Sequence, residues 1–274
     1  MDDRERYGLT ADEILYLSAG LGMDRFYGIP DRLSSLSRQA LQMRVLEIQD
    51  SLSQKGYLQS DFDGNMQTDS MLLQMLAACG DNDGFLCFEY CLGGSTQTGR
   101  LYFIKGESVY KMTPEENLYR FAPVAWEEMK AEVFGALAWK ETEEAAEFPF
   151  TILQRDLEKA ARLAGRSAQK KAEGVLLEAG AGICMTETIL AGMTGGADFY
   201  SLLFFDSQTE ESPGLSIQFL QGKILAAMEY ETVNDEDCVR FRELERKELD
   251  ALLEKGFVML GAASRTARQG IEFA

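Results

Sequence analysis

Two stretches of the chain share one pattern and decide how the fold is read. They are LYFIKGESVYKM at Leu101–Met112 and IQFLQGKILAAM at Ile217–Met228. In both, an apolar run leads to a glycine and a second apolar run follows, with Gly106 and Gly222 at an offset of 222 − 106 = 116. Apolar, β-branched and aromatic runs around a glycine are typical of two antiparallel strands joined by a tight turn. The sequence therefore predicts the same hairpin twice.

The repeat extends beyond the two hairpins. At the same offset Phe103 falls on Phe219, and an apolar strand is expected before each hairpin, at Phe85–Cys91 and Tyr200–Asp206. Further elements recur in the same order. In the first half these are an opening helix from Thr10, a helix from Asp69, a short strand at Leu118–Phe121 and a closing helix at about Pro123–Leu137. Their counterparts in the second half are a helix from Phe150, a helix from about Thr186, a strand at Cys238–Phe241 and a helix at about Glu243–Lys255.

The halves differ most between the opening helix and the sheet. Gly22 and Gly165, which end the opening helices, lie 165 − 22 = 143 residues apart, whereas Leu72 and Ile189 in the following helices lie 189 − 72 = 117 apart. The first half therefore holds 143 − 117 = 26 additional residues. A helix at Leu33–Ser53 is expected to fill them, where the second half has only a shorter helical stretch at Ser167–Leu177.

These recurrences predict an α+β protein with two pseudo-symmetric lobes from an internal duplication. The first repeat, with its extra helical segment, is residues 1–140, and the second is residues 141–274. Each lobe is expected to pack helices on a small antiparallel sheet of three strands. The charged stretch Lys140–Glu147 is expected to join the lobes. Residues 66–134 and 183–255 should share strand order and helix placement.

Composition limits the classes of function. The 274 residues carry a net charge of −18, from 27 basic and 45 acidic side chains, which argues against binding to a nucleic-acid backbone. The chain has no histidine, so the commonest general base and the usual zinc ligand are missing. Its 5 cysteines form no CxxC and are expected to be buried, reduced thiols. No apolar run approaches the ~20 residues of a membrane span and no signal peptide is recognised, which predicts a cytoplasmic protein.

Three short motifs are candidates for chemistry, and none is complete. Asp61–Asn65 suggests a calcium loop, but its glycine stands at the fourth position and Leu72 replaces the final Glu. Ser167–Lys170 satisfies S-x-x-K without an S-D-N or K-T-G partner. Gly180–Gly182 begins a dinucleotide fingerprint, but Met185 replaces the third glycine. The sequence therefore predicts no catalytic residue, no cofactor and no metal, and a histidine-free hydrolase is the least favoured alternative.

One further stretch favours a different class of protein. LEIQDSLSQKGYL at Leu46–Leu58 resembles the helix and turn before the wing of winged-helix DNA-binding proteins. The following residues, Gln59–Asn65, are acidic, whereas a wing that contacts phosphate should be basic. A winged-helix-derived regulatory or scaffold protein therefore stays open as an alternative.

The layout as a whole resembles a known family. LTADEILYL at Leu9–Leu17, KGYLQSDFDGN at Lys55–Asn65 and RLYFIKGESVY at Arg100–Tyr110, followed by a second α+β half, resemble the EspG family. These are the chaperones of type VII (ESX) secretion, and the resemblance covers nearly the whole chain. It implies a cytoplasmic protein that binds helical-hairpin secretion substrates and covers their apolar tips without catalysis. Lys, Met, Glu and Tyr are frequent and only 5 residues are proline. With this composition, the resemblance implies a distant version of the family that serves a Gram-positive type VII system. It transfers no partner-binding residue.

Overall fold

The computed structural model describes residues 7–60, 66–92, 95–137, 148–207 and 215–271. The first half of this part contributes β1 (Tyr7–Leu9), α1 (Ala11–Gly20), α2 (Arg38–Gln54), β2 (Leu58–Ser60), β3 (Met66–Thr68), α3 (Ser70–Gly80), β4 (Gly84–Leu92), β5 (Ser95–Lys105), β6 (Ser108–Glu115), β7 (Leu118–Val124) and α4 (Trp126–Ala136). The second half contributes β8 (Phe150–Leu153), α5 (Gln154–Gly165), α6 (Gln169–Glu178), α7 (Ile183–Met193), β9 (Asp198–Asp206), β10 (Leu215–Gln221), β11 (Leu225–Val233), β12 (Glu236–Glu243) and α8 (Arg246–Ile271).

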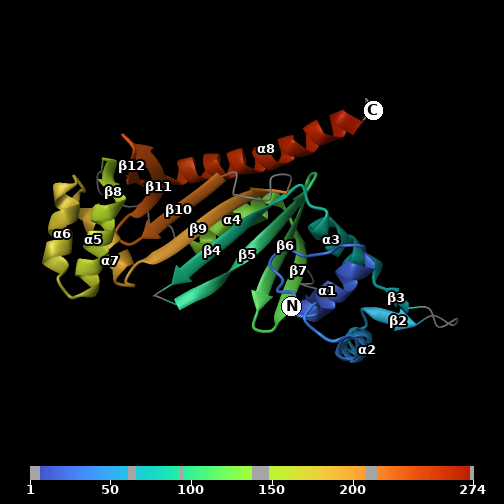
Figure 1. Ribbon diagram of the computed structural model, residues 1–274. Helices are drawn as coiled ribbons and strands as arrows, with labels where there is room; N and C mark the ends of the chain where they lie inside the picture. The colour runs from blue at the N-terminus through green and yellow to red at the C-terminus, as the bar shows by residue number, and fades with distance from the viewer. Residues whose placement is uncertain (1–6, 61–65, 93–94, 138–147, 208–214, 272–274) are drawn as a thin grey trace.

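The fold is α+β, as the sequence predicts, and is built on one antiparallel sheet of 10 strands (Figure 1). The strand order is β1-β7-β6-β5-β4-β9-β10-β11-β12-β8, so corresponding strands of the two halves lie at equal distances from the middle. Each half supplies five strands rather than the expected three, and β4 pairs with β9 along the join. The two halves share their strand order, as the repeat predicts, but they form one sheet rather than two small ones, and an origin by duplication stays a hypothesis.

The two predicted hairpins differ by one residue at their turns. Met112 pairs with Leu101, and Met228 pairs with Gln218. The strands before the turns are therefore offset by 218 − 101 = 117, and those after them by 228 − 112 = 116. The path from Gln218 to Met228 is thus one residue shorter than the path from Leu101 to Met112, and the offset of 117 places Gly222 opposite Lys105, so Gly106 and Gly222 are not equivalent positions.

This correction changes which aromatic residues correspond. Phe103 matches Leu220 rather than Phe219, because the strands before the turns carry the larger offset. Side chains alternate between the faces of a strand, so a shift of one residue reverses the face. Phe219 and its true counterpart Tyr102 lie in one core cluster, on the opposite face of the sheet from Phe103 and Leu220.

The register also places a pseudo-twofold axis at the centre of the sheet. On the central strands the two halves are offset by 198 − 84 = 114. The pairs that fix this offset are Gly84 with Ile104 and Asp198 with Gln221. Phe88 pairs with Leu202, and 202 − 88 = 114, so each of these residues pairs with its own counterpart. Such a pair must lie on a twofold axis, which therefore passes between Phe88 and Leu202.

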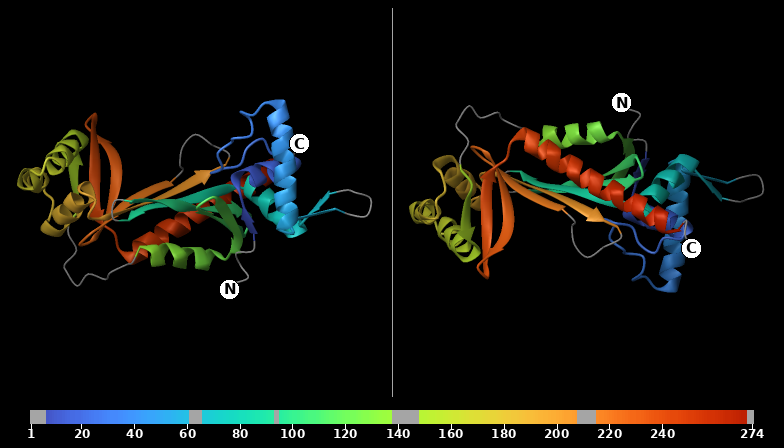
Figure 2. Two further views of the ribbon diagram at one scale, coloured as in Figure 1. Left: turned by 90° about the horizontal axis from the view of Figure 1, so that it is seen from below. Right: turned by 90° about the horizontal axis from the view of Figure 1, so that it is seen from above.

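The helices lie in two layers, one on each face of the sheet (Figures 1 and 2). Helices α4 and α8 lie together behind the middle of the sheet in the view of Figure 1, over the largest core cluster. Its central members include Leu86, Phe88, Tyr102, Tyr200 and Phe219. Helices α1, α2 and α3 cover one end of the opposite face, and α5, α6 and α7 cover the other end. Each fully buried aromatic side chain contributes about 1.5–3 kcal/mol through burial.

Several predicted boundaries need correction. Phe150 begins the strand β8 rather than a helix, because Phe150 and Ile152 are buried on alternate positions and α5 starts only at Gln154. Helix α2 starts after the cap Ser37, not at Leu33, whose amide hydrogen-bonds to the Asp31 carboxylate in a turn. Helix α8 runs to Ile271, beyond the expected end. The predicted junction, Lys140–Glu147, lies outside the described residues.

Candidate functional site

The middle of the sheet carries helices on one face only, as far as the described residues go (Figure 2). Between the helix groups at its two ends, the opposite face shows two rows of side chains on β5, β4, β9 and β10. We call these residues the central strip: Leu101, Cys87, Leu203 and Ser216 in one row, and Glu89, Ser201 and Gln218 in the other. The pseudo-twofold axis runs through this strip.

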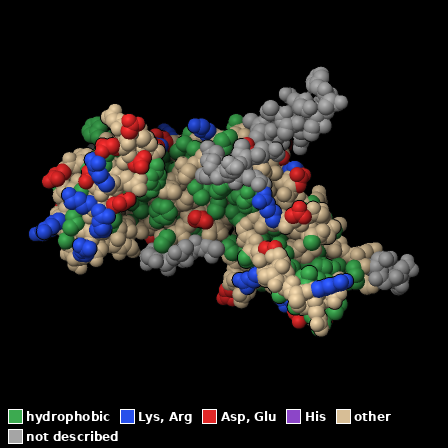
Figure 3. Space-filling view, viewed as in Figure 1, with side chains coloured by type: hydrophobic (Ala, Val, Ile, Leu, Met, Phe, Trp, Pro, Cys, Tyr) green, Lys and Arg blue, Asp and Glu red, His purple; other side chains and the backbone are tan. Residues whose placement is uncertain are grey.

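The central strip changes from apolar to polar along its length. Leu101, Cys87 and Leu203 are half-buried, and beyond them the half-buried Phe205 stacks on Phe85 with ring centroids 4.7 Å apart. At the other end Ser216 and Glu89 are exposed and Gln218 is half-buried, while Ser201 on β9 is buried. Figure 3 shows hydrophobic side chains gathered over the middle of this face, between the two helix groups. The strip can therefore offer apolar contact on one side and hydrogen bonds on the other.

The opposite face of the sheet is tied to its helices by polar contacts. The Glu132 carboxylate on α4 accepts hydrogen bonds from Arg100 Nη1 at 3.0 Å, Tyr102 Oη at 2.8 Å and Lys111 Nζ at 2.9 Å. Burial, and then the Glu132 charge, raise the pKa of the Tyr102 hydroxyl, so it remains a donor at neutral pH. These contacts hold α4 against the sheet and leave this face closed.

Helices α4 and α8 are also joined to each other across the two halves. Lys130 Nζ lies 2.6 Å from Glu254 Oε1, and Trp126 Nε1 donates to the same oxygen at 3.0 Å. The hydrogen bond that Lys130 donates to the Glu254 carboxylate raises the pKa of Lys130. Trp126 also stacks on Phe257 with ring centroids 4.2 Å apart. The helix layer is thus one unit, and the central strip lies on the only face of the central strands that the described helices leave open.

The chemistry of the central strip is that of a contact surface. Burial, reinforced by the neighbouring Glu89 carboxylate, raises the pKa of the Cys87 thiol to about 12, so it stays protonated and is a poor nucleophile or metal ligand at neutral pH. Within the described residues no group of three or more His, Cys, Asp or Glu side chains could hold a metal ion. The predicted absence of catalysis and of metal stays a prediction.

The motifs singled out in the sequence lie away from the central strip. Ser167, with φ +58°, lies in the turn between α5 and α6, and Gly180–Gly182 connects α6 to α7. Asp61–Asn65 lies outside the described residues. No residue of the strip was singled out from the sequence as partner-binding, although Phe85–Cys91 and Tyr200–Asp206 gave a signal. Their apolar residues fall on both faces of each strand, and only one of these faces is needed for the core under α4 and α8.

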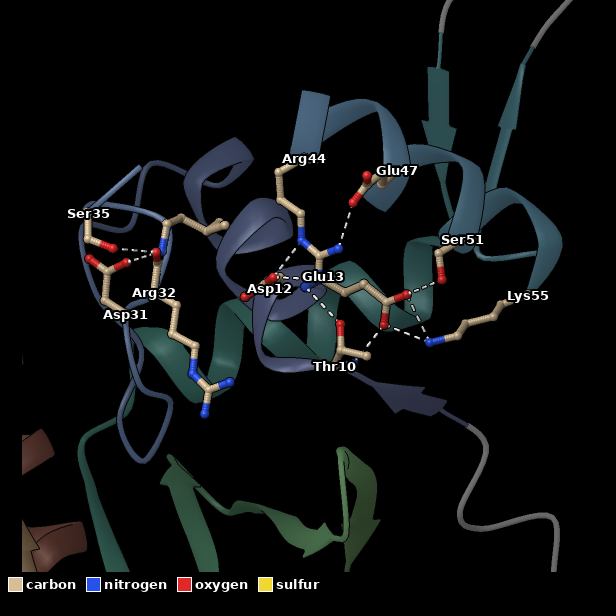
Figure 4. A network of polar contacts seen from close by, with 11 residues as sticks. Thr10, Asp12, Glu13, Asp31, Arg32, Ser35, Arg44, Glu47, Ser51 and Lys55 are labelled. Carbon is tan, nitrogen blue, oxygen red and sulfur yellow. Dashed lines mark hydrogen bonds and ion pairs between the residues drawn. The ribbon is translucent and has the colours of Figure 1, made fainter. Parts of the chain in front are cut away.

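The wing-like stretch is held by a buried carboxylate network (Figure 4). Glu13, only 1% exposed, accepts from Thr10 N at 2.7 Å, Ser51 Oγ at 2.7 Å and Lys55 Nζ at 2.6 Å. Burial alone would raise the pKa of Glu13, but the bonds from Lys55, Thr10 and Ser51 outweigh it and leave the pKa lowered. Helix α2 is followed by the hairpin β2–β3, in the place that a wing would take in a winged-helix protein. Lys55 of this stretch, however, is paired with Glu13 in the network.

No helix within the described ranges combines the length and the apolar character needed to cross a bilayer.

The layered sheet and its helices make an α+β fold that is similar to one solved structure. The solved structure of the Mycobacterium tuberculosis type VII secretion system chaperone EspG5, in complex with the PE25-PPE41 dimer, is similar to this chain with a TM-score of 0.57. The match covers 90% of this chain and 94% of that chain at 11% sequence identity, and it concerns the fold. No family model and no curated protein matches the sequence.

Proposed function

We propose that this protein is a cytoplasmic, non-catalytic chaperone or adaptor that binds a helical partner protein on the central strip. The observation that carries the proposal is the asymmetry of the sheet. One face of the central strands is sealed by α4 and α8, and the other presents a half-buried apolar row between two helix groups. Apolar surface left exposed in this way marks an interaction site.

The geometry favours a helix or a helical hairpin as the partner. The strip lies between the helix groups at the two ends of the sheet, so an incoming helix would place its apolar side on Leu101, Cys87 and Leu203. A helix-in-groove arrangement places apolar anchors at helical spacing against such a surface. The similarity in fold to a chaperone solved with the PE25-PPE41 dimer supports this class of partner. We extend the proposal to helical-hairpin substrates of a Gram-positive type VII system.

The proposal is tested by calorimetry against small helical-hairpin proteins encoded beside this chain. Two variants block the strip from neighbouring strands: Leu203→Glu on β9 and Ser216→Arg on β10, the latter at an exposed position where the change costs little folding energy. Val258→Glu, at a position 62% exposed on α8, is the matched control. We expect the strip variants to bind at least about tenfold more weakly and the control to bind like the unmodified protein.

Two outcomes would remove the proposal. One is that no such hairpin protein binds more tightly than roughly 10 μM, a level at which a specific interface is weak. The other is that the Ser216→Arg protein, folded by circular dichroism, binds as well as the unmodified one. The regulatory or scaffold alternative would then be preferred.

A further inference from the structure

We propose a second docking surface, on the outer side of α5, that binds an acidic helical segment of a partner protein. It is formed by four basic residues that we call the basic stripe: Arg155, Lys159 and Arg162 on α5, and Arg166, the C-cap residue that follows it. It is separate from the central strip and does not rest on the function proposed above.

The spacing of these residues aligns them on one side of the helix. They occur at i, i+4, i+7 and i+11, which at 3.6 residues per turn gives a single line about 17 Å long. The line is opposite the side on which Ala160 and Ala164 are buried against the sheet. All four residues are exposed, and the side chains of Arg155 and Arg162 are 69% and 64% exposed.

The basic stripe stands out against the charge of the rest of the chain. Between residues 155 and 171 the sequence has 6 basic and 2 acidic side chains, a net charge of 6 − 2 = +4. The remaining residues then carry −18 − 4 = −22. Figure 3 shows the corresponding group of basic side chains over α5 and α6, at the end of the molecule. One basic surface on an acidic protein indicates attraction for an anionic partner.

The first half shows what covers this position in the fold. With the offset of 143 that relates β1 to β8, the stripe residues correspond to Asp12, Tyr16 and Ala19 on the outer side of α1 and to Met23 just after it. There α2 packs against the helix, and the contacts are Arg44 to Asp12 at 2.7 Å and Gln49 Nε2 to Tyr16 Oη at 2.8 Å. In the second half this side of α5 is open, and its charge is reversed relative to Asp12. A covering helix would therefore be acidic.

Charge and geometry favour a protein segment over the other anions. A lipid surface or a nucleic-acid duplex carries negative charge over a wide area. The net charge of −22 on the rest of the chain would repel both. A single acidic helix needs only a narrow line of cations. Three of the four stripe residues are arginines, whose planar guanidinium groups match carboxylates in bidentate pairs.

The test uses a fluorescein-labelled, alanine-rich peptide with Glu at i, i+4, i+7 and i+11, together with the same peptide carrying Gln. Binding to the full chain is followed by fluorescence anisotropy at low salt. Lys159→Glu/Arg166→Glu removes the centre and end of the stripe. Arg32→Glu/Arg38→Glu makes the same change in net charge at exposed residues of the first half and is the matched control.

We expect the Glu peptide to bind at least about tenfold more tightly than the Gln peptide, and more weakly as salt screens the charges. The stripe variant should lose at least about tenfold in affinity, and the control should stay within about twofold. If the reversed variant does not fold, Lys159→Gln/Arg166→Gln serves in its place. Equal losses in stripe and control variants would overturn the proposal. Tighter binding to phosphatidylserine vesicles or to a DNA duplex than to the Glu peptide would overturn it as well.

Discussion

The opening helices of the two halves pack on the sheet alike and differ on their outer sides. Leu17 of α1 and its counterpart Ala160 of α5 are both buried against the sheet. The outer side of α1 is covered by α2, whereas that of α5 is exposed and basic. The halves thus share their apolar contacts and strand register, which build the fold. Their polar contacts differ between the halves, and this difference allows each half a separate function.

The helix caps show the same divergence at closer range. Thr10 and Glu13 form a capping box at the start of α1, with the Glu13 carboxylate fully enclosed. At the offset of 143 their counterparts are Leu153 and Asp156, and α5 has no side-chain cap. The first half therefore depends on a buried charge that the second half replaces by apolar packing.

The largest effect is expected where the halves share most, at the pseudo-twofold axis. Leu202→Ala should destabilise the protein by about 3 kcal/mol, because Leu202 is fully buried under the helix layer. Leu203→Ala, the next residue on the same strand, lies on the open face and should cost less than about 1 kcal/mol. Urea unfolding measures both. Equal costs would mean that the two faces of the central strands are not distinguished by burial.

The next effect concerns the buried carboxylate that only the first half has. Glu13→Gln should cost about 2 kcal/mol, because it removes the charge that pairs with Lys55 at 2.6 Å inside the protein. Asp156→Asn, at the corresponding but only partly buried position, should cost less than about 0.5 kcal/mol. Similar losses in the two variants would contradict the contrast drawn between the halves.

The cost of Glu13→Gln should also depend on pH. Because the pKa of Glu13 is lowered from 4.5 in the folded protein, its contribution is complete above about 4.5 and is lost as the pH falls through the lower, folded value. The stability difference between the unmodified protein and the variant should therefore be constant near neutrality and shrink in acid. A difference that grows as the pH falls below 4.5 would have the wrong sign.

The sequence predicted the parts of the fold that depend on local patterns. The helix starts at Thr10 and Asp69 and the shared order of strands within each half follow from neighbouring residues and from alternation. The single sheet did not follow, because the pairing of β4 with β9 joins segments 114 residues apart. The edge strand β8 was missed because four residues carry too little pattern to separate a strand from the start of α5. The central strip needed the knowledge of which face the helices cover.

The turn glycines show why the repeat was aligned one residue off. Both stand at the same offset as the flanking apolar residues, yet Gly106 has φ +61°, and Gly222 is required for space. A Cβ on Gly222 would lie 3.0 Å from Thr188 Cα. Gly106→Asn should cost at most about 1 kcal/mol, since Asn tolerates the left-handed region. Gly222→Asn should cost about 2 kcal/mol by overpacking. Thermal unfolding measures the two costs in stability. A larger cost for Gly106→Asn than for Gly222→Asn would favour treating the two turns as equivalent.

The smallest effect tests the outer sides of the opening helices directly. Asp12 pairs with Arg44 at 2.7 Å, with side chains 14% and 42% exposed, while its counterpart Arg155 pairs with Glu236 at 2.8 Å, with side chains 69% and 47% exposed. Water screens the second pair more, so a double-mutant cycle should give about 0.5–1 kcal/mol for the first and less than about 0.3 kcal/mol for the second. The Asp12–Arg44 coupling should also persist better in 1 M salt, where the Debye length falls to about 3 Å. A stronger coupling at Arg155 would mean that Glu236 already occupies the basic stripe and leaves less of it for a partner.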